Sequence, residues 1–188
     1  MVAGPGGCGQ AVRFRARSQD RLAAPITGDL ATRFSFVVWV NVEHKRHWQT
    51  IMAYQVPGAG PEAAFGLRLI DGAIALDFKK ANSHTSPALP ALRLREHEWH
   101  HVVYTYDAHQ NKVSVYRDGD LVLARALQDS ESCLHGVCLE GIGPMWLGGD
   151  VGEERALDGE IAEVRVYTGI ELSSKEVKQL YEESKPQC

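Results

Sequence analysis

The sequence predicts an all-β protein, folded as a two-sheet antiparallel sandwich with a short C-terminal helix. Short segments with strand periodicity recur along the chain, turn residues separate them, and one amphipathic helical segment appears near the end. Short strands at regular intervals with turn signals between them are typical of a sandwich or a barrel. The 188 residues suffice for one domain with a substantial core.

The clearest stretch runs from residue 98 to 123, EWHHVVYTYDAHQNKVSVYRDGDLVL. Its first part, residues 99–106, carries apolar and aromatic residues on both alternating faces, which indicates a strand in the middle of a sandwich. Asp118-Gly119 fits a two-residue hairpin turn, because both central residues of that turn need a positive φ. We therefore expect a meander of three strands that buries aromatic side chains.

A second clear strand covers residues 34–42, with alternate apolar residues on one face and Val37 and Trp39 on the other. Asp71-Gly72 predicts another hairpin, between strands at 67–70 and 73–78. Residues 79–90 are polar and contain proline, so a long loop is expected there. Shorter strands are expected at 11–14, 22–26, 50–54, 91–94, 145–147 and 161–167.

The C-terminal helix has a defined start. Ser173 is the expected N-cap and Glu176, three residues later, completes a capping box. Val177, Leu180 and Tyr181 then follow the i, i+3, i+4 spacing of an amphipathic helix.

Composition excludes some classes of partner. The net charge is −4, whereas binding to nucleic acid requires a basic face. No apolar run reaches the ~18 residues of a membrane helix, so no membrane insertion is expected. Residues 1–10 lack the pattern of a signal peptide. We expect a flexible N-terminal segment at 1–10 and a single domain at 11–188.

The four cysteines lack C-x-x-C spacing, which argues against a zinc or thioredoxin-type site. Three disulfide pairings are possible. Cys133–Cys138 together with Cys8–Cys188 is the pairing that a sandwich with neighbouring termini favours. Four free thiols in a reducing compartment are the alternative.

The motif W-H-H-V-x-x-x-Y, followed after a loop by V-x-V-Y-x-D-G, resembles the central signature of laminin-G-like jelly rolls in the concanavalin A-like lectin/glucanase superfamily, which includes the pentraxins. The closing G-x-I-x-E-V-R-V-Y and L-S-x-x-E-V-x-x-L-Y segments resemble the end of such domains. The resemblance covers roughly residues 12–181. It implies a jelly-roll sandwich and, by its usual setting, an extracellular or cell-surface protein with core tryptophans Trp39, Trp99 and Trp146.

The resemblance leaves three functions open. A non-catalytic module that binds glycans at its loops or concave sheet face is the main hypothesis, and a protein-interaction or adhesion domain of a larger surface protein is the alternative. A glycan-cleaving enzyme is remote, because the two carboxylates of retaining glucanases at E-x-D-x-x-E spacing are missing. Glu160 and Glu163, the nearest acids, would face opposite ways on a regular strand.

Candidate ligand-binding residues lie in the loops. Trp48 follows Arg46 and His47 at a loop–strand boundary, where an exposed indole beside polar donors can stack on a sugar or anchor a protein. His84 lies in the polar 79–90 stretch. His100 and His101 are adjacent on a strand, so one is expected between the sheets and the other at the rim.

Calcium is the ion that the resemblance implies, and it requires six to eight oxygen ligands. Asp20 matches the acidic residue of the early loop in such domains. Glu163 lies on the last strand, where relatives often carry Asp-Glu and this chain has Ala162-Glu163, so one expected carboxylate is missing.

Overall fold

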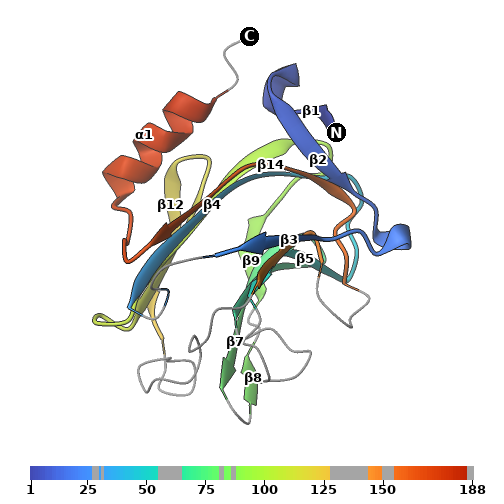
Figure 1. Ribbon diagram of the computed structural model, residues 1–188. Helices are drawn as coiled ribbons and strands as arrows, with labels where there is room; N and C mark the ends of the chain where they lie inside the picture. The colour runs from blue at the N-terminus through green and yellow to red at the C-terminus, as the bar shows by residue number, and fades with distance from the viewer. Residues whose placement is uncertain are drawn as a thin grey trace.

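The computed structural model describes residues 1–26, 30, 32–54, 65–80, 83–85, 88–127, 144–149 and 155–185, with backbone only for 77–80, 83–85 and 88–91. It is a sandwich of two antiparallel sheets (Figure 1). The first sheet has the order β1-β2-β14-β4-β10-β11-β12, with bounds β1 Val2–Ala3, β2 Gln10–Phe14, β14 Gly159–Thr168, β4 Arg33–Val42, β10 Trp99–Asp107, β11 Lys112–Arg117 and β12 Asp120–Ala126.

The second sheet has the order β3-β13-β5-β6-β7-β8, and β9 also pairs with β7. Its strands are β3 Leu22–Pro25, β13 Pro144–Leu147, β5 Trp48–Tyr54, β6 Phe65–Ile70, β7 Ala73–Lys80, β8 Ser83–Thr85 and β9 Ala88–Arg93. Two 3-10 turns, η1 Pro5–Gly7 and η2 Ala16–Ser18, flank β2, and one helix, α1 Ser174–Ser184, follows β14. In the described part of the chain no helix is long and apolar enough to span a membrane.

Both predicted Asp-Gly hairpins are confirmed. Asp71 and Gly72 have φ values of 51° and 78°, and Asp118 and Gly119 have 55° and 84°. Positive φ at both central residues gives the turn a twist that matches the twist of the flanking strands. The first turn joins β6 to β7 and the second joins β11 to β12.

The alternation of side chains predicted for β4 determines which residues face the second sheet and which face outward. Phe34, Phe36 and Val38 belong to the core between the sheets, together with Tyr104 of β10. Val37 and Trp39 lie on the opposite face of the same sheet, where α1 covers them (Figure 1). Among the described residues, the protein therefore has one large core between the sheets and, beneath the helix, a second core made of two smaller clusters.

The second core corrects two expectations. His101 is 1% exposed, but it packs against Trp39 and Tyr181 on the helix side, with ring centroids 5.2 and 5.6 Å away, and not between the sheets. Trp39 is buried in the same place, whereas Trp99 and Trp146 are only half-buried. Periodicity assigned these residues to a face, but it could not show that a helix closes over it.

The stretch predicted as a loop at 79–90 is also corrected. β7 continues to Lys80, and β8 and β9 each pair with it, with Lys79 opposite His84 and Ala75 opposite Ala88. Backbone pairing to a neighbouring strand overrides the weak strand preference of a polar segment. At the N-terminus, β1 pairs with β2, and Val2 packs in the same cluster as Tyr181 of α1. The flexibility expected for residues 1–10 stays a prediction.

The capping box of α1 is confirmed. The Ser173 hydroxyl accepts a hydrogen bond from the Glu176 backbone N–H, and the Glu176 carboxylate accepts one from the Ser173 N–H at 2.8 Å. The Ser173 hydroxyl also donates to the Glu176 carboxylate at 2.6 Å, and this bond together with the one from the Ser173 N–H lowers the pKa of Glu176. Val177 is fully buried, and Leu180 and Tyr181 are partly buried, as the spacing predicted.

Replacing Ser173 with alanine should lower the free energy of unfolding by about 1 kcal/mol, because the backbone N–H of Glu176 loses its acceptor. Urea unfolding measures this change, and Lys175→Ala serves as control because Lys175 is exposed in the same turn. Equal stability of wild type and S173A would show that the cap is not needed to hold α1 on the sheet.

Candidate functional site

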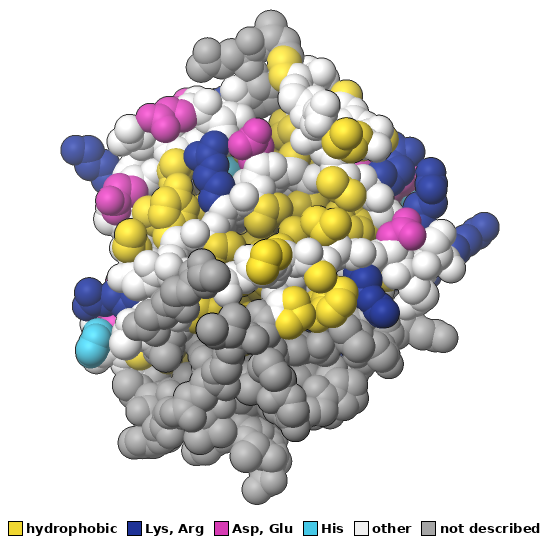
Figure 2. Space-filling model, viewed as in Figure 1, with side chains coloured by type: hydrophobic (Ala, Val, Ile, Leu, Met, Phe, Trp, Pro, Cys, Tyr) yellow, Lys and Arg dark blue, Asp and Glu magenta, His cyan; other side chains and the backbone are white. Residues whose placement is uncertain are grey.

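A groove of about 430 Å³ opens at one rim of the sandwich, and charged side chains line it. We call it the basic groove. It comprises Arg13, Arg15, Arg17, Glu43, His44, Lys45, Arg46 and Asp158. Three separate segments supply these residues: the end of β2 with η2, the loop between β4 and β5, and the residue before β14. Figure 2 shows Lys and Arg side chains gathered on the right of the molecule, where Figure 1 places the turn after β2.

The arginine-bearing wall of the groove is a closed turn. The Asp20 carboxylate accepts a hydrogen bond from the Arg15 N–H at 3.0 Å, and the Asp20 N–H donates to the Arg15 carbonyl at 3.4 Å. Gln19 adopts the left-handed conformation, with φ 53°, and its side chain donates to the Ala16 carbonyl. This turn fixes the backbone from which Arg15 and Arg17 project.

A buried glutamine holds the opposite wall. Gln49 is 0% exposed; its amide nitrogen donates to the His44 carbonyl at 3.1 Å and its amide oxygen accepts from the Asp158 N–H at 2.9 Å. The Asp158 carbonyl in turn accepts from the N–H groups of Glu43 and His44. The loop between β4 and β5 is thereby fastened to the start of β14.

Counting only the residues that the structure describes, the groove contains five cations and two carboxylates. The Arg13 guanidinium binds Glu160 through two N–H groups, at 3.0 and 2.6 Å, and Glu160 raises the pKa of Arg13. Asp158 lies 3.4 Å from Arg46 and 3.6 Å from His44. Among the described residues, no acid pairs with the guanidinium of Arg15 or Arg17.

Lys45 continues the loop wall towards the hairpin between β6 and β7. Its N–H donates to Glu96 at 2.7 Å, which lowers the pKa of Glu96, and its ammonium lies 3.9 Å from the same carboxylate. Its aliphatic chain lies so close to Gly72 that a Cβ there would meet it at 2.8 Å. A glycine suits this position both for its positive φ and for this close approach.

The structure brings the predicted ligand residues only partly together. Arg46 lines the basic groove, whereas His47 and Trp48 lie beside it. The His47 ring packs edge-on against Trp48, and its Nδ1 lies 3.3 Å from Asp71. The Arg155 guanidinium lies over the Trp48 ring, 4.9 Å from its centroid, so one face of that indole is covered. His84 lies in β8, and its side chain is outside the described residues.

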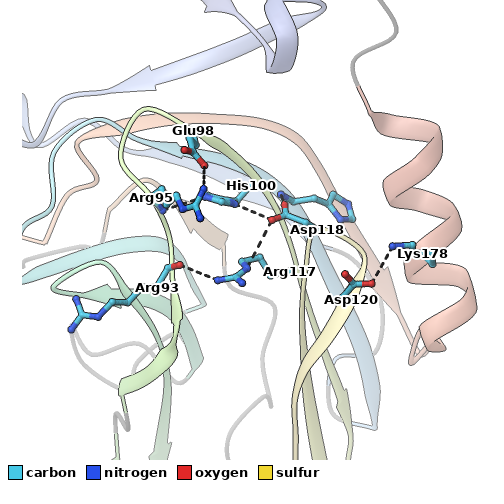
Figure 3. A network of polar contacts seen from close by, with 9 residues as sticks. Arg93, Arg95, Glu98, His100, Arg117, Asp118, Asp120 and Lys178 are labelled. Atoms are coloured by element: carbon cyan, nitrogen blue, oxygen red, sulfur yellow. Dashed lines mark hydrogen bonds and ion pairs between the residues drawn. The ribbon is translucent and has the colours of Figure 1, made fainter.

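The paired histidines of the central motif serve a structural network (Figure 3). His100 Nδ1 lies 3.0 Å from the Asp118 carboxylate, and His100 Nε2 accepts from the Arg95 N–H at 3.2 Å. Burial alone would raise the pKa of Asp118, but hydrogen bonds from His100 and from the His101 N–H, together with Arg117, hold that pKa below its usual value. The network fastens the β11–β12 turn to the start of β10.

The two acids considered for glycan cleavage have different surroundings. Glu160 is 8% exposed and accepts hydrogen bonds from Arg13 and Asn41. Glu163 is exposed, lies in a bulge of β14 with φ 51°, and pairs with Arg165 at 3.2 Å. These two carboxylates therefore bind different cations on different parts of the strand.

The predicted calcium ligands are engaged elsewhere in the protein. Asp20 closes the η2 turn and Glu163 pairs with Arg165. No three His, Cys, Asp or Glu side chains within the described ranges gather as a metal site. The described residues do not by themselves fit calcium's shell of six to eight oxygens, and the calcium site stays a prediction.

Cys8 is disulfide-bonded. The other three cysteines, Cys133, Cys138 and Cys188, lie outside the described residues. The pairing expected from the sequence therefore stays a prediction.

Sequence reasoning missed Arg13, Arg15 and Arg17. The signal was present as R-F-R-A-R, three arginines at every second position. Read alone, such a run suggests a solvated face. Only the fold shows that it lies opposite the H-K-R run of residues 44–46.

A second concavity, of about 370 Å³, has a different character. It is lined by apolar side chains of β3, β13 and β14 and by Thr168. Figure 2 shows hydrophobic side chains across the middle of this face. Because Thr168 carries the one hydroxyl among its described lining residues, this cleft is a poorer fit than the basic groove for a ligand rich in hydroxyl groups.

The fold and the sequence together define the class of the protein. The family model described as the concanavalin A-like lectin/glucanases superfamily matches residues 16–178. The chain belongs to this superfamily. No curated protein matches it significantly in sequence.

Several solved structures share the fold. Domain 4 of AbnA, an extracellular arabinanase from Geobacillus stearothermophilus in complex with arabinotriose, has a TM-score of 0.69 at 18% identity, covering 95% of this chain and 79% of that one. The CBM40 of the Ruminococcus gnavus IT-sialidase, bound to α2,3 sialyllactose, has a TM-score of 0.63 at 14% identity, covering 86% and 97%.

The binding domain of botulinum neurotoxin serotype D has a TM-score of 0.66 at 14% identity, covering 91% of this chain but 42% of that one. The chain spans less than half the length of several structures that it matches. At these identities the likeness establishes the fold alone.

Proposed function

We propose that the protein is a non-catalytic glycan-recognition module that acts outside the cell or at its surface and binds its ligand at the rim loops. The observation that carries this proposal is the basic groove with its flanking His47 and Trp48. Recognition on a sandwich falls to loops held by a rigid scaffold. Gln49 and Asp20 fix the two walls of the groove by hydrogen bonds to backbone groups.

The groove suits a sugar for chemical reasons. Guanidinium and ammonium groups donate hydrogen bonds, whereas the carboxylates of Glu43 and Asp158 accept them from hydroxyl groups. Two structures of the same fold, one in complex with arabinotriose and the other bound to α2,3 sialyllactose, support the same class of ligand.

Replacing His47, Trp48 and His84 together with alanine should weaken glycan capture on an array by about tenfold or more. The melting temperature should stay within a few degrees, because His47 is exposed and Trp48 lies only partly buried at the first position of β5. Lys175→Ala on α1 is the control.

Three results would contradict parts of this proposal. Capture of a protein partner and of no glycan would favour the adhesion alternative. Hydrolysis of a β-glucan that Glu160→Gln abolishes would show that the protein is an enzyme. Unchanged capture by the triple variant would show that the binding site does not depend on His47, Trp48 or His84.

A further inference from the structure

The basic groove concentrates positive charge on an acidic protein. The chain has a net charge of −4, but among the described residues the groove holds five cations against two carboxylates. A concave surface lined by one sign of charge raises the local concentration of counter-ions. Like charges held together also repel one another, so the cluster is destabilising unless an anion neutralises it.

Several of these cations retain binding capacity. Arg15 and Arg17 are exposed and, within the described part of the chain, have no carboxylate partner. Arg46 makes only a long contact to Asp158, at 3.4 Å through Nε, which leaves its terminal nitrogens without a partner among the described residues. Three guanidinium groups can therefore each bind an oxyanion through two parallel hydrogen bonds.

The lining also restricts the type of sugar. None of the eight described lining residues is a Phe, Tyr or Trp, so these residues offer no Phe, Tyr or Trp ring on which a neutral sugar could stack. Affinity must then come from charge and hydrogen bonds. Because hydrogen bonds to backbone groups fix both walls, little backbone conformational entropy is lost when a ligand binds.

We propose that the basic groove binds an anionic glycan through sulfate or carboxylate groups, which pair with Arg15, Arg17 and Arg46. This inference rests on the proposed glycan-recognition function and names its ligand class. The anionic groups lie against the arginines, and the ring hydroxyls donate to Glu43 and Asp158.

The test compares two variants with the same change in charge. Arg17→Glu reverses an exposed cation of the groove, and Lys175→Glu reverses an exposed cation on α1. The probes are oligosaccharides of chondroitin sulfate, of hyaluronan and of chitin, which are sulfated and carboxylated, carboxylated only, and neutral. Affinity is measured at about 50 and about 300 mM NaCl, because screening weakens exposed ion pairs.

The wild type should bind one or both anionic probes at low salt, lose affinity at high salt, and bind the chitin oligosaccharide weakly or not at all. Arg17→Glu should weaken the anionic probes about tenfold, and Lys175→Glu less than twofold. Preference for chondroitin sulfate over hyaluronan would assign the anionic group as sulfate. Equal affinity for both would assign it as carboxylate.

The outcomes separate this inference from the proposed function. If the chitin oligosaccharide binds as tightly as the anionic probes, or if both charge reversals weaken binding equally, the inference is wrong but the protein still recognises glycans. If no glycan of any kind binds, the proposed function itself is wrong.

Discussion

Replacing Trp39 with alanine should lower the free energy of unfolding by about 3–5 kcal/mol, the cost of lost burial plus the cavity that remains. Trp39 is 4% exposed and contacts His101 and Tyr181, so it joins β4, β10 and α1. Its Nε1 also donates to the Ser184 hydroxyl at the end of α1, at 3.0 Å. Urea unfolding measures the loss, and helix content by circular dichroism reports whether α1 stays docked.

Two further variants separate the contributions of Trp39. Trp39→Phe keeps most of the apolar contact and removes the hydrogen bond, so it should cost much less than alanine. Trp99→Ala should also cost less, because Trp99 is half-buried. A loss under about 1 kcal/mol for Trp39→Ala would show that α1 contributes little to folding.

Acid should destabilise the protein between about pH 6.5 and pH 4 through His101. Burial lowers the pKa of His101 from 6.5 to about 4, and the nearby charge of Arg165 adds to this effect while Asp118 opposes it. Between these two pKa values His101 is therefore protonated in the unfolded chain and neutral in the folded protein. The contribution of His101 to stability is complete above pH 6.5 and falls as the pH decreases, and the loss of unfolding free energy reaches about 3 kcal/mol once the pH is below 4.

His101→Gln tests this prediction by difference. Its unfolding free energy should change less between pH 7 and pH 4.5 than that of the wild type, even if it is lower at pH 7. The carboxylates with lowered pKa values, Asp107 and Asp118, lose their contribution mainly below the usual pKa of 3.8, outside this window. Parallel pH profiles of the two proteins would show that His101 can be protonated without opening the interface beneath α1.

Local signals in the sequence were sufficient for most elements of the fold, although they did not predict β1 or β8. Both Asp-Gly turns require positive φ, which few residue pairs accept, so each identified a hairpin without any further context. The capping box at Ser173 likewise identified the start of the helix without further context, because its hydrogen bonds lie within four residues. The alternation in β4 was equally informative, since one face had to contact the second sheet.

Which element covers the outer face of β4 could not be predicted from the sequence of the strand itself. Val37 and Trp39 are apolar, but nothing near them in the sequence specifies a helix as the covering layer. The position of His101 depends on the same contact. These residues were predicted as buried or packed, while the identity of their partners followed only from the docking of α1.

The candidate site depends even more on tertiary structure. Arg17, Arg46 and Asp158 are far apart in the chain, and each alone is an ordinary exposed or loop residue. The sequence by itself determined most of the strands, the two Asp-Gly turns and the superfamily, because those depend on patterns within a few residues of one another. Only the packing of the two sheets decided that three charged segments share one rim, because charge placement on a surface follows from the topology that brings distant loops together.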